Sequence, residues 1–296
     1  MDNRAEVREF LITRRAKISP EQAGLPQHGQ RRVPGLRRGE VAGLAGVSIE
    51  YYSKLERGHL AGASPSVLDA IARALQLDNA ERAHLFDLAQ AADGGSTRAS
   101  RRRGHEAKPW HPSDNLQWVL DAMRDAPAIV GNGRSDFLAA NHLGRAMYAD
   151  VLSDSTGTPN FARFAFLNPA ARRFYPDWDW FADITVANLR TEAGRNPHDR
   201  QLHELVGELS TCSEEFRRRW SAHDVRIHAT GTKHFHHPVV GDLTLAYETV
   251  DLRGDDGISM TIYAAQPGSP SESALQLLAS WASTRPAPII SERADH

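Results

Sequence analysis

The segment from Ser48 to Gly58 carries the side chains in this sequence that are best suited to reading another molecule. If a helix begins after Ser48, its outward face displays Ile49, Glu50 and Lys54. A lysine can donate hydrogen bonds to guanine O6 and N7, a glutamate can accept one from cytosine N4, and an apolar side chain can pack on a thymine methyl group. These three side chains are therefore candidate base contacts of a helix lying in the major groove of double-stranded DNA.

A second set of side chains borders the first and is suited to the DNA backbone. Basic side chains neutralise phosphates, and hydroxyl groups hydrogen-bond to them, so such contacts fix the register on DNA and carry the salt dependence of binding. Arg31, Arg32, Arg37 and Arg38 form a basic run with no acidic residue between them. The predicted DNA-binding set, base contacts included, is Arg37, Arg38, Ser48, Ile49, Glu50, Tyr51, Ser53, Lys54 and Arg57.

Residues 36–58 as a whole predict the two short helices and tight turn that would position this surface. Ala45 is small enough for a second helix to cross close by, and Gly46 can take the positive φ angle of the turn at little cost. Ser48 is a good helix cap, and Tyr52 and Leu55 return to the core four and seven residues later. We therefore expect a helix-turn-helix.

The surrounding residues predict a small helical bundle that carries a basic charge. Ser64 followed by Pro65 marks one helix start, and Asp78 with Glu81 has the spacing of a capping box at another. Residues 1–108 contain 18 Lys and Arg against 13 Asp and Glu, whereas the remainder contains 17 against 24. This asymmetry favours a polyanionic partner for the first part of the chain.

The composition bounds the class of protein. The chain has 296 residues, of which 41% are hydrophobic and 24% charged, as in ordinary globular proteins of about two domains. Its apolar runs are shorter than the roughly 20 residues of a membrane span, and its first residues lack a secretory pattern, so we expect a cytoplasmic protein, nucleoid-associated when bound to DNA, with no membrane partner. A single cysteine, Cys212, excludes an internal disulfide and a cysteine-rich zinc site.

The order of predicted elements suggests two domains of different class. Residues 1–92 form the helical domain, residues 93–114 a polar Gly, Ser, Pro and Arg linker, residues 115–270 a second domain, and residues 271–296 a C-terminal helix and tail. Within the second domain, a hairpin over residues 128–141 precedes a long helical stretch. Strands then follow at residues 225–230, 234–240, 243–251 and 258–265. This order indicates an α+β domain with an antiparallel sheet covered on one face.

Two families share motifs with these segments. Arg32-Val-Pro-Gly-Leu-Arg-Arg, Glu40-Val-Ala, Leu44-Ala-Gly-Val-Ser, Tyr51-Tyr and Leu55-Glu-Arg-Gly make the first part resemble phage-repressor-type (XRE) helix-turn-helix regulators of the actinomycete type. The second part resembles their MmyB-like ligand-binding domain, on Asp177-Trp178, Val186 to Arg190, Leu205 to Leu209, Phe216, Trp220, His237 to Gly241 and Leu243 to Glu248. One departure is Gly39, a weaker helix former than such regulators usually have there.

The resemblance implies a PAS-like fold with an apolar cavity for a fatty acid or another small amphipathic ligand, and no other cofactor. Aromatic side chains can either line such a cavity or fill a core. Arg190 could pair with a ligand carboxylate, or equally make a structural salt bridge. The candidate ligand-binding residues are Phe161, Phe164, Trp178, Phe181, Arg190, Phe216 and Trp220.

Other functions remain open at this point. His234 and His236 would share one face of a strand, but no third metal ligand is fixed by spacing, so we predict no metal site. The sequence has no nucleophile elbow, P-loop or dinucleotide fingerprint, so a DNA-tethered enzyme is a less favoured alternative. The second domain could instead serve only for dimerisation or protein docking. Because one helix-turn-helix contacts few base pairs, we expect a homodimer.

Overall fold

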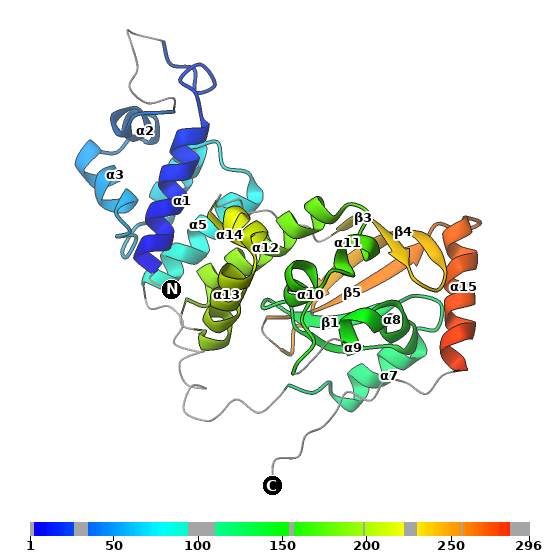
Figure 1. The fold of residues 1–296 in the computed structure, drawn as a ribbon. Coiled ribbons are helices and arrows are strands. Elements are labelled where there is room, and N and C mark those ends of the chain that lie inside the picture. Colours follow the sequence, from blue (N-terminus) through cyan, green and yellow to red (C-terminus); the bar gives the residue numbers. More distant parts are fainter. Residues whose placement is uncertain are drawn as a thin grey trace. The chain divides into compact units, whose positions relative to one another are not determined.

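The computed structural model of the chain describes residues 3–26, 35–93, 110–153, 157–197, 199–221, 230–255 and 257–284 (Figure 1). Its contacts divide the chain into two units. The first, which we call the HTH unit, comprises residues 1–108, 189–207 and 218–227. The second, the sheet unit, comprises residues 109–188, 208–217 and 228–296. The HTH unit therefore includes two segments from the second half of the sequence, and the predicted linker lies largely outside the described residues.

The HTH unit begins with a bundle of helices packed around one apolar core. Its helices are α1 (Asn3–Lys17), α2 (Arg38–Ala45), α3 (Ile49–Glu56), α4 (Pro65–Ala74) and α5 (Asn79–Ala92). Ser64 caps α4 by accepting from the Val67 N–H, with proline in its first turn. Asp78 and Glu81 form a reciprocal capping box at α5, so both predicted helix starts are confirmed.

The sheet unit contains a five-stranded antiparallel sheet in the order β2-β1-β5-β4-β3. The strands are β1 (Ala128–Asn132), β2 (Phe137–Ala140), β3 (Thr230–His237), β4 (Gly241–Asp251) and β5 (Ile258–Ala265). The predicted hairpin and the α+β class are confirmed. The predicted strand at 225–230 falls almost entirely outside the described residues, and the strand expected at 234–240 begins earlier, at Thr230.

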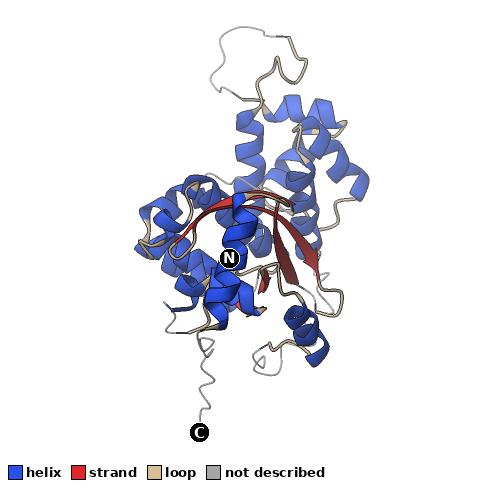
Figure 2. Ribbon diagram, turned by 90° about the vertical axis from the view of Figure 1, so that its right-hand side faces the viewer, coloured by secondary structure: helices blue, strands red, loops and turns tan. Residues whose placement is uncertain are grey.

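Helices cover the two faces of this sheet unequally, as Figures 1 and 2 show. On one face, α8 (His142–Met147), α11 (Ala171–Phe174) and α15 (Pro270–Ser283) contact the strands, with α9 (Ala149–Ser153) and α10 (Phe161–Leu167) beside them in sequence. This face carries the larger core, which includes Phe235, Leu245 and Tyr263. On the opposite face, Leu120 of α7 (Asp114–Ala122) joins a smaller cluster with Val130 and Met260.

Three helices contribute residues to both units: α12 (Trp178–Arg195), α13 (Arg200–Cys212) and α14 (Glu214–Ser221). Residues of α12 up to Asn188 belong to the sheet unit, and those from Leu189 belong to the HTH unit. Within the described residues, none of the helices has both the length and the apolar content needed to cross a bilayer.

Candidate DNA interface and ligand cavity

Helix α3 is held in place from both ends and along one side. The Ser48 hydroxyl accepts a hydrogen bond from the Tyr51 N–H at 3.1 Å, which caps the first turn. The preceding helix α2 ends at Gly46, whose φ of 66° lies in the left-handed region that favours glycine. Tyr52 and Leu55 are buried in the core of the unit. The turn and the inward face therefore have the geometry that the sequence predicted.

The opposite side of α3 is open to solvent. Ile49, Glu50 and Lys54, the predicted base contacts, are all exposed, and the Ile49 side chain is 53% accessible although it is apolar. Of the predicted backbone contacts, Arg37 and Arg57 are exposed. Tyr51 and Ser53 are half-buried. An exposed isoleucine beside charged side chains suits a face that covers a base edge when DNA is bound.

Arg38 has a structural partner that sequence reasoning missed. The Glu56 carboxylate is almost fully buried, and one oxygen accepts from Arg15 Nε at 2.6 Å while the other accepts from Arg38 Nε. The carboxylate thus ties α3 to α1 and to the start of α2. The signal was available in the sequence, because Glu56 directly follows Leu55 on the buried side of a short helix. Half of the Arg38 side chain stays exposed, so a phosphate contact remains compatible with this pair.

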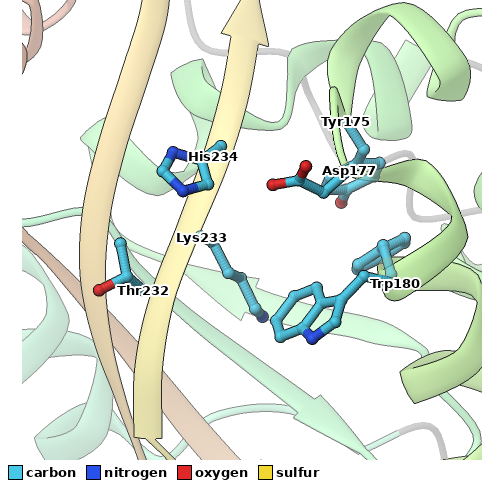
Figure 3. Close-up of a pocket in the computed structure, with 7 residues that line it drawn as sticks. Tyr175, Asp177, Trp180, Thr232, Lys233 and His234 are labelled. Atoms are coloured by element: carbon cyan, nitrogen blue, oxygen red, sulfur yellow. The ribbon is translucent and has the colours of Figure 1, made fainter.

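A cavity of about 330 Å³ opens in the sheet unit between β3 and the start of α12 (Figure 3). Three aromatic side chains form one wall, and polar side chains come from β3 and from the segment before α12. The lining residues are Tyr175, Asp177, Trp180, Phe181, Thr232, Lys233 and His234. The Tyr175 and Phe181 rings stack with their centroids 3.7 Å apart, which forms a rigid apolar wall.

Lys233 is the cation of this cavity. Because strand residues alternate between faces, Lys233 shares the covered face of β3 with Phe235 and His237, both of which are buried. Its ammonium nitrogen lies 4.2 Å from the ring centroid of Tyr247 and 5.6 Å from that of Tyr263. Burial lowers the pKa of this ammonium to about 8. The sequence signal was a lysine at an inward position of a strand, which we had not singled out.

Buried tyrosines lie beneath the cavity. The Tyr148 hydroxyl donates to the Tyr263 hydroxyl at 2.8 Å, and burial raises the pKa of both groups above their ordinary value. The Tyr247 hydroxyl is buried and has no hydrogen-bond partner among the described residues. Such a group can be satisfied by a bound molecule.

The aromatic residues that the sequence nominated are distributed among several places. Phe181 lines the cavity. Phe164 and Trp178 are buried in the core of the sheet unit, with Phe161 packed against that core. The Trp178 indole N–H donates to the Ala165 carbonyl at 2.9 Å. The two others lie elsewhere: Phe216 is buried against Phe166, and Trp220 belongs to the HTH unit. Helical spacing could not separate wall from core, because both require the same apolar side chains.

Arg190 belongs to the HTH unit and is not among the residues that line the cavity. It is fully buried, and its Nη1 donates to the Glu6 carboxylate of α1 at 2.6 Å. Its Nη2 donates to the Trp220 carbonyl, and the guanidinium lies 4.2 Å from the centroid of the Trp220 ring. Burial lowers the pKa of Arg190, and Glu6 opposes this shift. The structural salt bridge, one of the two roles we considered, is thus the arrangement present.

The histidines of β3 have local partners. His234 Nδ1 lies 3.1 Å from the Thr244 hydroxyl, and His236 Nδ1 lies 2.6 Å from the Asp242 carboxylate. His237 is buried on the other face, where burial lowers its pKa. Over the described part of the chain, no three His, Cys, Asp or Glu side chains come together as a set of metal ligands.

Comparison with known proteins identifies both halves of the chain. A helix-turn-helix domain family matches residues 13–85. The family described as MmyB-like transcription regulator ligand binding domain matches residues 112–278, which is more than half of the sequence. No curated protein matches the chain. The chain thus belongs to the MmyB-like transcription regulators and is a DNA-binding regulator with a small-molecule ligand domain.

Proposed function

We propose that this regulator binds its operator through α3 and is controlled by a small amphipathic, fatty-acid-like molecule in the cavity between β3 and α12. The observation that carries the proposal is the cavity itself, in which the aromatic wall of Tyr175, Trp180 and Phe181 faces the cation of Lys233. Apolar walls with a few convergent polar groups are the usual construction of a ligand site. The two domain families that match the chain support a role in regulation rather than catalysis.

Helix α12 offers a route from ligand to DNA. Near its start it places Trp180 and Phe181 in the cavity wall, and three turns later it places Arg190 in the buried ion pair with Glu6. Glu6 belongs to α1, which packs with α3 in the HTH unit. A ligand can change DNA affinity only if it binds the two states of the protein differently. We propose that the position of α12 distinguishes these states.

A native mass spectrum of the purified regulator, taken before and after denaturation, tests for the ligand. A retained mass of an amphipathic molecule is expected. Footprinting then defines the operator, and operator affinity is measured with and without the recovered molecule. We expect a change of about 5-fold to 150-fold, the usual range of coupling between sites. The proposal fails if the purified protein holds no such molecule and no added lipid or organic acid changes its operator affinity. The second domain would then serve as a docking module.

A further inference from the structure

We propose that Lys233 is the head-group site of this cavity, and that the ligand is a small amphipathic monoanion, such as an aromatic or medium-chain carboxylate, bound with its charged end inward. This inference deepens the proposed function and rests on it.

The ammonium of Lys233 lacks a counterion. Among the described residues no ion pair or hydrogen bond to it is found, and the rings of Tyr247 and Tyr263 lie near it. Cation–π contacts compensate a desolvated ammonium in part, by far less than a carboxylate would. The low pKa of Lys233 reports the same deficit, because desolvation is its cause. A ligand carboxylate would supply the missing charge and accept charge-assisted hydrogen bonds.

The side chains that line the cavity differ in exposure, and Lys233 is half-buried. Asp177, Thr232 and His234 are exposed, whereas Tyr175 and Phe181 are buried. Figure 3 shows the side chains of Asp177 and His234 on one side of the opening, with those of Lys233 and Trp180 near one another on the other. An anionic head group near the exposed Asp177 carboxylate would be repelled. The head group is therefore expected at the ammonium, and the apolar part of the ligand against the aromatic wall.

Gly231 and Tyr247 lie beside Lys233 in the sheet. Gly231 precedes Lys233 on the same face of β3 and pairs with Tyr247 on β4. A Cβ atom at Gly231 would lie 3.4 Å from the Tyr247 ring, which is an ordinary van der Waals contact. The Tyr247 hydroxyl is buried, lacks a partner among the described residues, and can donate a hydrogen bond.

The volume limits the length of the ligand. About 330 Å³ is close to the lower end of the range of roughly 300–1,000 Å³ found for ligand pockets. The cavity therefore suits a small acid better than a long-chain lipid. An aromatic cage with a carboxylate at its rim would also suit an organic cation, but the Lys233 charge opposes that class.

Isothermal titration of the full-length protein with matched probes tests the head group. The probes are 3-phenylpropionate and octanoate, their neutral amides, 3-phenylpropylamine and myristate, each at pH 7. We expect either short anion to bind at least about tenfold more tightly than its own amide, because only the anion can pair with the ammonium. The amine should not bind, and myristate should bind more weakly than octanoate. Equal affinity of acid and amide, preference for the amine or for myristate, or no binding by any probe would overturn the inference.

The variant Lys233→Met tests the residue, because methionine keeps the apolar stem without the charge. We expect it to lose at least about tenfold of its affinity for the short acids and to bind acid and amide alike. The control variant Lys17→Met removes an exposed lysine of α1 and should bind as the wild type does. If Lys233→Met does not fold, the acid and amide comparison in the wild type still decides. Suppose that Lys233→Met binds the acids as tightly as the wild type does, and that some other molecule changes the affinity of the protein for its operator. This result would overturn the inference about Lys233 and leave the proposed function standing.

Discussion

Lys54 and Arg37 are both exposed cations of the HTH unit, but they have different positions on the two helices of the helix-turn-helix. Lys54 lies within α3, whereas Arg37 caps the start of α2 and leaves its side chain free of the Glu56 pair. We therefore predict that Lys54→Ala changes the preference among operator sequences, by about 1–3 kcal/mol at one base pair. Arg37→Ala should weaken binding to all sequences and lower the slope of log affinity against log salt by about 1.

Competition binding with a set of single-base operator variants, at several salt concentrations, separates the two effects. Glu21→Ala alters an exposed residue after α1 that is outside the predicted DNA-binding set. It serves as the control, and its DNA binding should equal that of the wild type. If Lys54→Ala and Arg37→Ala weaken binding by the same factor on every sequence, Lys54 contacts phosphate rather than a base.

The ligand-free cavity should make stability depend on pH in a particular window. An unfolded lysine holds its proton up to a pH of about 10.4, whereas the folded Lys233 ammonium, with a pKa of about 8, gives it up earlier. Between these values the unfolded chain binds more protons, so the folded state gains stability as the pH rises. The cost of the buried charge is thus fully present below pH 8.

We predict that Lys233→Met is more stable than the ligand-free wild type at pH 7, and that this difference shrinks at pH 10. The other titratable groups around the ammonium are Tyr175, Asp177, His234, Tyr247 and Tyr263, which both proteins share. Burial raises the pKa of Tyr247 and Tyr263 above their ordinary value. Thermal unfolding at pH 7, 8, 9 and 10 measures the difference, and a difference independent of pH would mean that the ammonium is well solvated.

At the scale of elements, the second half of α12 is built into the HTH unit. Arg190 pairs with Glu6 of α1, and Arg195 pairs with Asp87 of α5 at 2.9 Å. Between them, Gly194 lies so close to His84 that a Cβ atom would come within 2.7 Å of its ring. A glycine at this point of the helix permits a close approach that any other residue would prevent.

We predict that Arg190→Met destabilises the protein by about 3–5 kcal/mol, because it leaves the Glu6 carboxylate buried without its guanidinium. The double variant Glu6→Gln with Arg190→Met should recover much of this loss. Arg195→Met is the matched control: its side chain is 53% exposed, so we expect a change within about 1 kcal/mol. Urea unfolding measures the free energy of unfolding of the three variants. If Arg190→Met is as stable as Arg195→Met, Glu6 finds another partner.

The double variant also tests the route through α12. It retains every residue that lines the cavity, so it should bind the ligand as the wild type does. If α12 transmits the signal through the Glu6 and Arg190 pair, the ligand should change operator affinity less in this variant than in Arg195→Met. An undiminished response in the double variant would place the coupling elsewhere.

At the scale of the whole molecule, we predict that two copies bind one operator. A single α3 can reach only a few base pairs, and two such helices spaced by one turn of DNA, about 34–36 Å, give the affinity that regulators need. Sedimentation velocity of the protein alone and with operator DNA measures this. A monomer in both conditions would contradict the prediction, as would a footprint covering one half-site.

Short-range sequence patterns predicted much of the fold. The caps at Ser48, Ser64 and Asp78 depend on a few neighbouring residues, and each has the predicted geometry. The hairpin of β1 and β2 and the alternation along β4 are likewise short-range signals. The exposed face of α3 follows from the same periodicity, because a helix that buries Tyr52 and Leu55 turns Glu50 and Lys54 to its opposite side.

The partners of charged residues needed the tertiary structure. Glu6 and Arg190 are 184 positions apart, and no local pattern relates them. Lys233 could be placed on an inward face by alternation, yet its tyrosine neighbours come from the register of β3, β4 and β5. The sequence alone determined the helix-turn-helix, the antiparallel sheet and the class of protein, because these follow from short-range propensity and motif. Only the tertiary structure decided which buried charge has a partner and which one faces a cavity, because both depend on segments that meet after folding.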